Sequence, residues 1–323
     1  MPPQTWHARW GRPVTMVKKY TFDQVDVLLV DTDLNARQGV RTILANNGFT
    51  GVTLGTDLQR VKTPITQHMP DIMLCGTEFP DGKITDLLRD IRHNRIGNNP
   101  FMPVIVFLDE PTPELVADVL SAGPDDVVMK PVSTRALLDR LGQQIHKRKP
   151  YIVTDDCVGP ARKGDDTSRA IVPPNPLHAK ATGGKASFHE VERGIQDALS
   201  AVNDRRLENT GPEIAALVGR LVLMLDKPTV TEAAKGGLQM LIEMNQDVIN
   251  RLEGSRYDHV SELCRAMIIV CERIKKDTGG PADKTQVRLL KPLSQSIQAG
   301  FSGGIANAQA ARAIAQKIGI DLG

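Results

Sequence analysis

The strongest constraint on the fold is a regular alternation of short apolar runs and amphipathic segments between residues 23 and 148. Most of the apolar runs are continuous, which is typical of strands buried on both faces of a sheet. The segments between them carry apolar residues at helical spacing. We predict strands at 25–30, 51–54, 71–75, 103–108 and 127–129, and helices at 36–46, 58–68, 83–93, 112–122 and 133–146. This order predicts an α/β doubly wound domain with a five-stranded parallel sheet.

The segments on either side of this domain have a different composition. Residues 1–22 form a basic N-terminal arm with two tryptophans and no acidic residue, which is typical of an anchoring arm or of a disordered tail. Residues 149–186 are rich in Pro, Gly, Lys and Arg and show little periodicity. They predict an interdomain linker or strap, of which Tyr151, Ile152 and Val153 are able to cover part of the sheet domain.

Residues 187–323 carry only helical patterns and predict a separate all-α helical bundle domain. Capping boxes, in which a Ser or Thr is followed by an acid three residues later, predict four helix starts. They are Ser187/Glu190, Thr210/Glu213, Thr229/Glu232 and Ser255/Asp258. Val260, Cys264, Met267, Cys271 and Ile274 are spaced as the buried seam of a bundle helix. Two further helices are expected at about 284–299 and 304–318.

Charge, apolar runs and cysteine content argue against several classes of protein. The net charge is +2, and residues 190–321 contain 17 basic and 17 acidic residues, so nucleic acid is not an expected partner. A membrane is not expected either, because the apolar runs are too short to span a bilayer. No signal peptide is expected, because the N-terminal residues lack the apolar core that one needs. The four cysteines form no CxxC pair, which favours reduced, buried thiols in a cytoplasmic protein.

Several linked motifs resemble the receiver family of two-component signalling over about 125 residues. Leu28-Leu29-Val30-Asp31 ends the first strand, and Pro70–Leu74 leads into the third. Pro80 and Gly82 follow at the family's spacing, and Lys130-Pro131 ends the fifth strand, where the family carries a lysine before a cis proline. The resemblance implies a flavodoxin-like form of the doubly wound sheet. It also implies a phosphoryl-transfer pocket, in which carboxylates bind Mg²⁺ beside a lysine.

Compared with that pattern, most of the reactive residues are missing. Asp31 and Lys130 remain, but Thr32 occupies the place of the second acid. Gly76 occupies the position of the phosphoacceptor, so that no nucleophile exists there. Leu108 occupies the position of the family's hydroxyl switch residue, and Val127 occupies the position of its aromatic switch residue. The resemblance therefore implies a degenerate receiver that cannot form an aspartyl phosphate.

Other charged residues offer weaker sites. We expect Glu78 to pair with Lys130, so that a fixed carboxylate replaces the phosphate; the alternative is a solvated loop residue. No metal site is predicted, with Asp31, Asp33 and Asp81 only weak candidates, because one well-placed acid rarely holds Mg²⁺. Arg162, Lys163 and Arg169 form either an anion-binding strap for a phosphate or cyclic dinucleotide, or a solvated basic linker.

These observations favour a non-enzymatic regulatory or scaffold protein. No motif supplies a nucleophile with its base, so we expect neither a catalytic residue nor a cofactor. Protein partners are expected for both the receiver and the helical domain, and a homodimer is plausible. The alternatives are a transcription or nucleic-acid-binding regulator and a sensor of a cyclic dinucleotide or other ligand.

Overall fold

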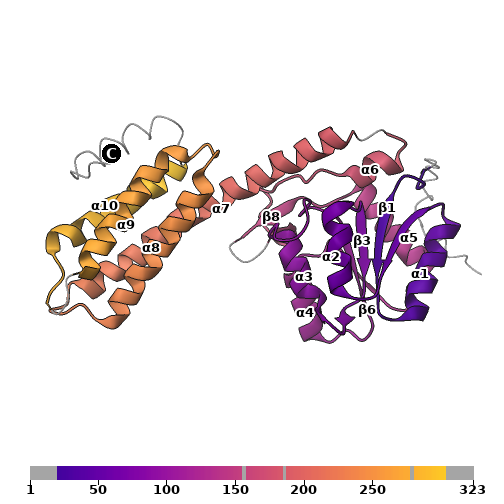
Figure 1. Ribbon diagram of the computed structural model, residues 1–323, viewed down its shortest axis with the longest axis horizontal. Coiled ribbons are helices and arrows are strands. Elements are labelled where there is room, and N and C mark those ends of the chain that lie inside the picture. The colour runs from indigo at the N-terminus through magenta and orange to yellow at the C-terminus, as the bar shows by residue number, and fades with distance from the viewer. Residues whose placement is uncertain (1–19, 155–157, 185–186, 277–279, 303–323) are drawn as a thin grey trace, which may run out of the picture.

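A computed structural model describes residues 20–154, 158–184, 187–276 and 280–302. They form an α/β domain, an extension that packs on it, and a helical bundle, and one long helix joins the last two (Figure 1). The predicted basic arm at 1–22 lies almost wholly outside the described residues, and so do Cys157 and the helix predicted at 304–318. In the part of the chain that is described, no helix is long and apolar enough to cross a membrane.

The α/β domain contains the predicted five-stranded parallel sheet, in the order β2-β1-β3-β6-β7. The strands are β1 (Asp26–Val30), β2 (Gly51–Gly55), β3 (Ile72–Cys75), β6 (Val104–Leu108) and β7 (Asp126–Met129). The helices are α1 (Leu34–Asn46), α2 (Leu58–Gln67), α3 (Ile84–Arg92), α4 (Pro113–Ser121) and α5 (Thr134–His146). All five predicted strands and helices are therefore confirmed, with ends that differ by one or two residues.

Two hydrophobic clusters hold the helices to the sheet. In β1, Leu28 and Val30 face α2, α3 and α4, whereas Val27 and Leu29 face α1 and α5. Both faces of the central strands are thus fully buried, which explains why these strands are apolar without alternation. Ser133 caps α5 as predicted, because its hydroxyl accepts a hydrogen bond from the amide of Ala136.

The segment predicted as a linker is folded against the sheet domain. β8 (Tyr151–Val153) pairs with β9 (Val158–Pro160), and α6 (Pro176–Ala181) packs beside α5. Tyr151 and Leu177 are both fully buried. Of the two alternatives the segment is a strap and not a free linker, and Tyr151 covers part of the sheet domain as predicted. The partners of these apolar residues lie far away in sequence, and the composition of the segment does not reveal them. We refer to residues 149–184 as the extension.

A helical bundle follows, and the described residues contribute four long helices to it: α7 (Phe188–Leu225), α8 (Glu232–Leu252), α9 (Ser261–Lys276) and α10 (Lys284–Ser302). A short 3₁₀ turn, η1 (Asp258–Val260), precedes α9. The predicted seam of α9 is buried along its whole length, and so is the matching stripe of α8. Each helix packs on two neighbours in the cyclic order α7-α8-α9-α10.

Only some of the predicted helix starts are correct. The capping box of Ser187 and Glu190 opens α7. The start predicted at Thr210 was wrong, because α7 is a single helix of 38 residues that continues through this position. The Thr210 hydroxyl donates to the carbonyl of Arg206 within the helix. Thr231, and not Thr229, caps α8.

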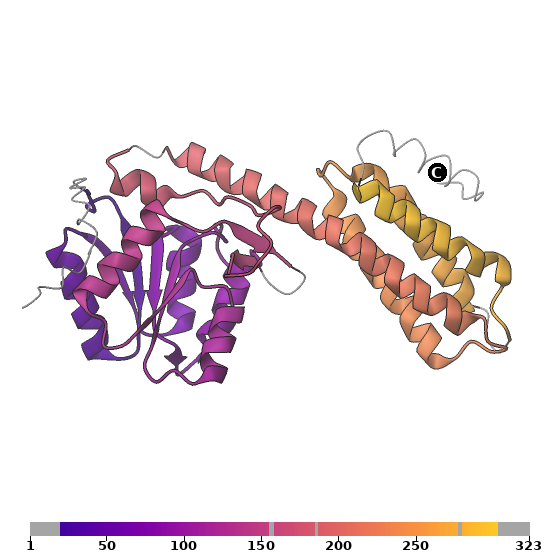
Figure 2. The same ribbon diagram turned by 180° about the vertical axis from the view of Figure 1, so that it is seen from behind.

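α7 belongs to both halves of the molecule (Figure 2). Its N-terminal part packs Ile195, Ala198 and Val202 against Tyr151 of the extension. Its C-terminal part, from Leu207 to Leu225, contributes to the bundle core. The α/β domain and the bundle are therefore connected by a rigid element rather than by a free loop.

Candidate functional site

The candidate site lies where the carboxyl ends of the parallel strands meet. Asp31 follows β1, Gly76 follows β3 and Lys130 follows β7. Because the strands are parallel and in register, these positions converge at one edge of the sheet. The structure therefore brings Asp31, Gly76 and Lys130 together at this edge.

An ion pair occupies the centre of this pocket. The Nζ of Lys130 lies 2.9 Å from Oδ2 of Asp31 and 3.0 Å from Oδ2 of Asp109. The side chains of Lys130 and Asp31 are only 9% and 3% exposed. Burial lowers the pKa of Lys130, but hydrogen bonds to the two carboxylates outweigh it, so the pKa is raised overall and the ammonium stays charged.

Gly76 removes the side chain that would project toward Asp31. A Cβ built on Gly76 would lie 3.0 Å from Oδ2 of Asp31, a contact tighter than most real Cβ contacts. The backbone of Gly76 is held in place, because its amide donates to the carbonyl of Val30 at 2.9 Å. A carboxylate introduced here would therefore meet the Asp31 carboxylate directly.

The expected pair between Glu78 and Lys130 was wrong. Lys130 uses Asp31 and Asp109 instead, and Glu78 is exposed at the start of the two-residue strand β4 (Glu78–Phe79), which pairs with β5 (Gly82–Lys83). Only the backbone of Glu78 contacts the site, because its carbonyl accepts the hydroxyl of Thr32 at 3.2 Å. The short hairpin turns the chain away from the pocket, and Asp109 supplies the second carboxylate.

Both switch positions are apolar and lie in the same hydrophobic cluster. Leu108 is 2% exposed, and Val127 packs against that cluster from the neighbouring strand. Neither side chain can donate or accept a hydrogen bond. This part of the pocket therefore cannot report on a phosphate through a hydroxyl or a phenol.

The acidic residues present do not fit a Mg²⁺ site. Asp31 is paired with Lys130, and its Oδ1 accepts the amide of Asp33. Asp33 itself caps α1. Asp81 accepts the amides of Leu58 and Gln59, and these hydrogen bonds lower its pKa. Among the residues that the structure describes, no cluster of three His, Cys, Asp or Glu could hold a metal ion.

The three basic residues of the proposed strap do not converge. Arg162 donates to the carbonyl of Pro124 at 2.8 Å, so its guanidinium ties the extension to the α/β domain. Arg169 lies 3.9 Å from Glu208 of α7, and Lys163 is exposed. These contacts give Arg162 and Arg169 structural partners within the chain.

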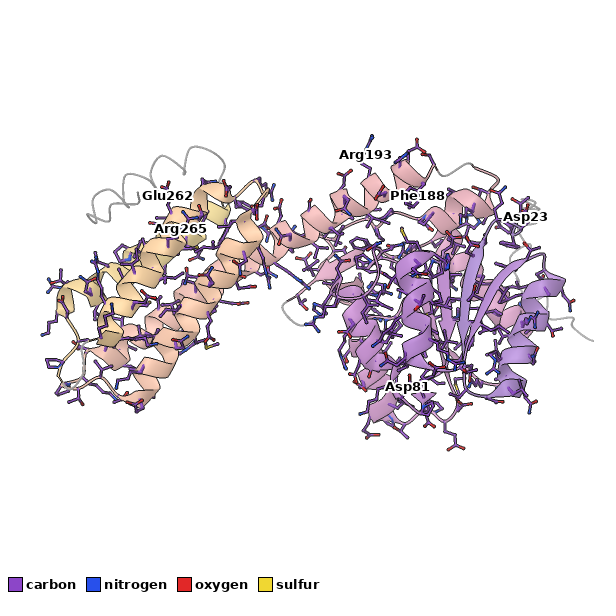
Figure 3. The ribbon with its side chains drawn as sticks, viewed as in Figure 1. Asp23, Asp81, Phe188, Arg193, Glu262 and Arg265 are labelled. Atoms are coloured by element: carbon purple, nitrogen blue, oxygen red, sulfur yellow. The ribbon has the colours of Figure 1, made fainter. Side chains whose placement is uncertain are left out.

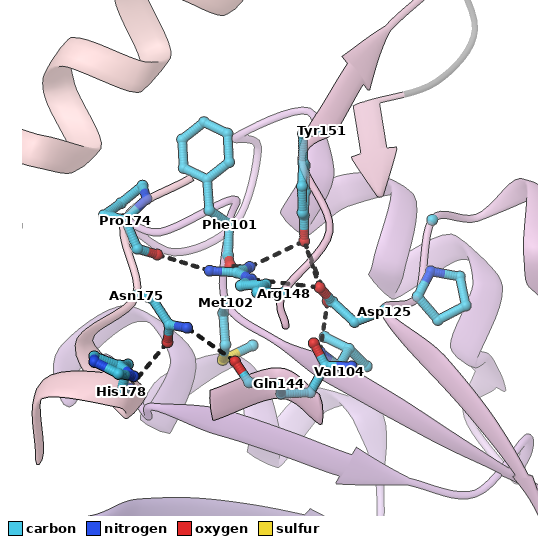
Figure 4. A network of polar contacts seen from close by, with 12 residues as sticks. Phe101, Met102, Val104, Asp125, Gln144, Arg148, Tyr151, Pro174, Asn175 and His178 are labelled. Atoms are coloured by element: carbon cyan, nitrogen blue, oxygen red, sulfur yellow. Dashed lines mark hydrogen bonds and ion pairs between the residues drawn. The ribbon is translucent and has the colours of Figure 1, made fainter. Parts of the chain in front are cut away.

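A buried polar network at the opposite edge of the sheet was not anticipated from the sequence (Figure 4). Asp125 accepts from Arg92 at 2.8 Å, from the amide of Val104 at 2.9 Å and from the Tyr151 hydroxyl at 3.1 Å. Arg148 lies 3.6 Å from the same carboxylate and donates to the carbonyl of Pro174 at 2.7 Å. Burial raises the pKa of Tyr151 to about 12, so the hydroxyl remains a donor.

This network fixes the extension to the α/β domain. The Arg92 and Arg148 guanidiniums each lie 5.3 Å from the centre of the Tyr151 ring, and both are almost fully buried. Tyr151 in turn contacts α7 through the shared cluster with Ile195. The only signal in the sequence was the apolar triplet at 151–153, which gives no indication of the charged partners.

Comparison with known proteins supports the assignment of the sheet domain to the receiver family. Residues 27–142 match the family described as Response regulator receiver domain. The chain is 32% identical over 114 residues to the "Probable transcriptional regulatory protein y4xI" of Sinorhizobium fredii, and 23% identical over 141 residues to the "Transcriptional regulatory protein ZraR" of Escherichia coli. These matches cover 35% and 44% of this chain, and 47% and 30% of the two relatives, so the chain spans less than half the length of either.

Solved structures similar to this chain include a CheY-like receiver domain protein from Methanospirillum hungatei, with 25% identity and a TM-score of 0.35. The match covers 38% of this chain and 95% of that one. Another is the chemotaxis protein CheY4 of Vibrio cholerae, with 21% identity and a TM-score of 0.34, covering 37% of this chain and 97% of that one.

Proposed function

From the premise that residues 27–142 are a response regulator receiver domain, we propose that this chain is a non-enzymatic regulatory or scaffold protein whose receiver works without aspartyl phosphate. The observation that carries the proposal is the arrangement of Gly76, Asp31 and Lys130. The acceptor carboxylate is missing, and the lysine that would bind the phosphoryl group is held by Asp31 and Asp109. An internal ion pair thus takes the place of a regulated phosphate.

Docking onto protein partners is the role that such a receiver retains. β7 is an edge strand of the sheet, and Met129 at its end is 61% exposed. Leu120 of the adjacent α4 is 37% exposed. Exposed apolar side chains beside a rigid sheet edge favour a protein interface. The helical bundle, attached rigidly through α7, provides a second surface for a partner or for a second copy of the chain.

The test is phosphoryl labelling with acetyl phosphate and Mg²⁺, followed by intact-protein mass spectrometry. We expect no labelling of the unmodified protein. The double variant Thr32→Asp/Gly76→Asp supplies two carboxylates beside Asp31 and Lys130, and we expect it to be labelled in a Mg²⁺-dependent manner. Labelling of the unmodified protein within the receiver would refute the proposal. The single variant Thr32→Asp is the matched control, because it adds an acid without an acceptor.

Transcriptional regulation is the second candidate, favoured by the names of the two relatives. Their matches span 114 and 141 of the 323 residues of the chain. The balanced charge of residues 190–321 argues against duplex binding. A salt-dependent mobility shift of a DNA duplex by the full chain would favour this candidate over the scaffold.

A further inference from the structure

A groove open to solvent lies between the C-terminal end of α7 and the first half of α10. Its volume is about 540 Å³, and its apolar lining includes Val222, Leu225 and Val287. Leu223, at the rim, is 75% exposed, one of the most exposed large apolar side chains among the described residues. Burying such a side chain on binding would remove its apolar surface from water and so favour association. The groove therefore offers an aliphatic surface without an internal partner.

Three cations follow one side of this groove. Lys284, Arg288 and Lys291 are spaced four and three residues apart in α10, so they share one face of the helix. All three are exposed, and none forms an ion pair with another residue in the described part of the chain. The groove lining contains one carboxylate, that of Asp226. The cations are thus in excess at this site.

Two other cations of the bundle have a carboxylate neighbour on their own helix. Arg251 pairs with Asp247 at 2.8 Å, and Lys235 pairs with Glu232 at 2.8 Å. Exposed cations without an ion pair also occur elsewhere among the described residues, such as Arg265 of α9, so the distinguishing feature of α10 is that three of them share the helix face beside the groove. An aliphatic floor flanked by unpaired cations is complementary to a ligand with apolar anchors and carboxylates.

The chemistry of the lining separates a protein ligand from a nucleic acid. No aromatic side chain lines the groove, so bases would find no surface on which to stack. A phosphate backbone would also leave the aliphatic floor unused. A groove between two antiparallel helices instead fits an amphipathic helix, whose apolar residues recur every three or four positions.

We propose that this groove binds an acidic amphipathic helix of a partner protein, with its apolar face against Leu223 and its carboxylates against Lys284, Arg288 and Lys291. The proposal rests on the interaction role proposed for the bundle, but it does not depend on the state of the acceptor pocket. The cations span two helical turns, about 10 Å, so a ligand helix of three to four turns would contact all of them.

The test is selection of ligands from a displayed library of random 15-residue peptides, panned on the full chain and on groove variants. We expect the unmodified protein to enrich peptides of net negative charge with apolar residues at helical spacing. Leu223→Asp and the double variant Lys284→Glu/Arg288→Glu should each weaken the enriched peptide at least about tenfold in fluorescence anisotropy. Arg265→Glu is the matched control, because Arg265 is an exposed cation on α9, away from the groove (Figure 3).

Each contrary outcome overturns the proposal. Enrichment of neutral or basic peptides, no enrichment, or an affinity unchanged by the groove variants would exclude an acidic helix as the ligand. Tighter binding of a DNA duplex or of anionic phosphatidylglycerol vesicles, lost in Lys284→Glu/Arg288→Glu, would assign the cations to phosphate. A dimer in sedimentation that Leu223→Asp dissociates would assign the groove to a second copy. The labelling experiment with acetyl phosphate is unaffected by any of these results, so the two proposals fail separately.

Discussion

Asp125→Asn should destabilise the receiver together with its extension. The substitution keeps the shape of the side chain but removes the one carboxylate shared by Arg92 and Arg148, whose side chains are 1% and 5% exposed. The Asp125 carboxylate accepts hydrogen bonds from the Val104 amide and from the Tyr151 hydroxyl. An asparagine has only one acceptor oxygen, and its NH₂ group is a donor that cannot accept these hydrogen bonds. Removing one partner of a buried ion pair costs about 3–5 kcal/mol.

The lower end of that range applies here. Arg92 keeps three hydrogen bonds to carbonyls, from Gly123, Pro100 and Met102, so its guanidinium does not lose all its partners. We therefore expect a loss of about 3 kcal/mol in the free energy of unfolding. For a cooperative unit of this size, that is a fall in Tm of roughly 6–12 °C.

Differential scanning calorimetry measures the Tm, and hydrogen exchange locates the weakened region. Exchange should rise in the extension and in the N-terminal part of α7, because Tyr151 joins both to the network. Asp126→Asn is the matched control. Asp126 pairs with Arg140 at 3.2 Å, but that arginine is 41% exposed, so the loss should stay within about 1 kcal/mol. Equal shifts in the two variants would refute the role assigned to Asp125.

Three further outcomes follow from single contacts. Lys130→Met should lower the free energy of unfolding by about 3 kcal/mol in chemical denaturation, because it leaves Asp31 buried without a cation; adding Asp31→Asn should recover most of the loss, and no recovery would contradict the pairing. Gly211→Ala should cost about 1–3 kcal/mol, because the new Cβ would lie 3.2 Å from the backbone of α10; the same change at Gly219, which has open space, is the control. Burial lowers the pKa of Lys180, but its hydrogen bond and ion pair with Asp71 raise it overall. The stability that this pair contributes is therefore present below the ordinary lysine pKa of 10.5 and is lost as the pH rises through the raised pKa of Lys180. In a Lys180→Met variant this loss is absent, so the free energy of unfolding should depend less on pH between neutral and alkaline conditions.

The sheet domain was predictable because its signals are local. Each strand carries its own apolar run, and the motifs at the strand ends fix the positions of Asp31, Gly76 and Lys130. What the sequence does not indicate is which carboxylate Lys130 selects. Glu78 and Asp109 follow different strands, and the choice between them depends on the turn of a two-residue hairpin.

The extension and α7 show a different limit. Tyr151 is buried by Arg148, Asp125 and Phe101, of which only Arg148 is near in sequence. In α7, Thr210 followed by Gly and Pro resembles a helix start, because proline is favoured in a first turn. No helix starts there, because packing against α10 favours a continuous α7. Gly211 lies where α10 comes close, so the glycine that suggests a break in the helix instead permits the contact between α7 and α10.

One consequence of α7 concerns the number of its residues rather than their kind. Val202 is anchored in the cluster shared with the extension, and Leu207 in the core of the bundle. An α-helix advances about 1.5 Å and turns about 100° per residue. Inserting one residue between these two anchors would leave both cores intact but rotate the bundle by about 100° around the helix axis. Substitutions in this segment preserve the rotation of the bundle relative to the α/β domain, whereas a change in the length of the segment does not.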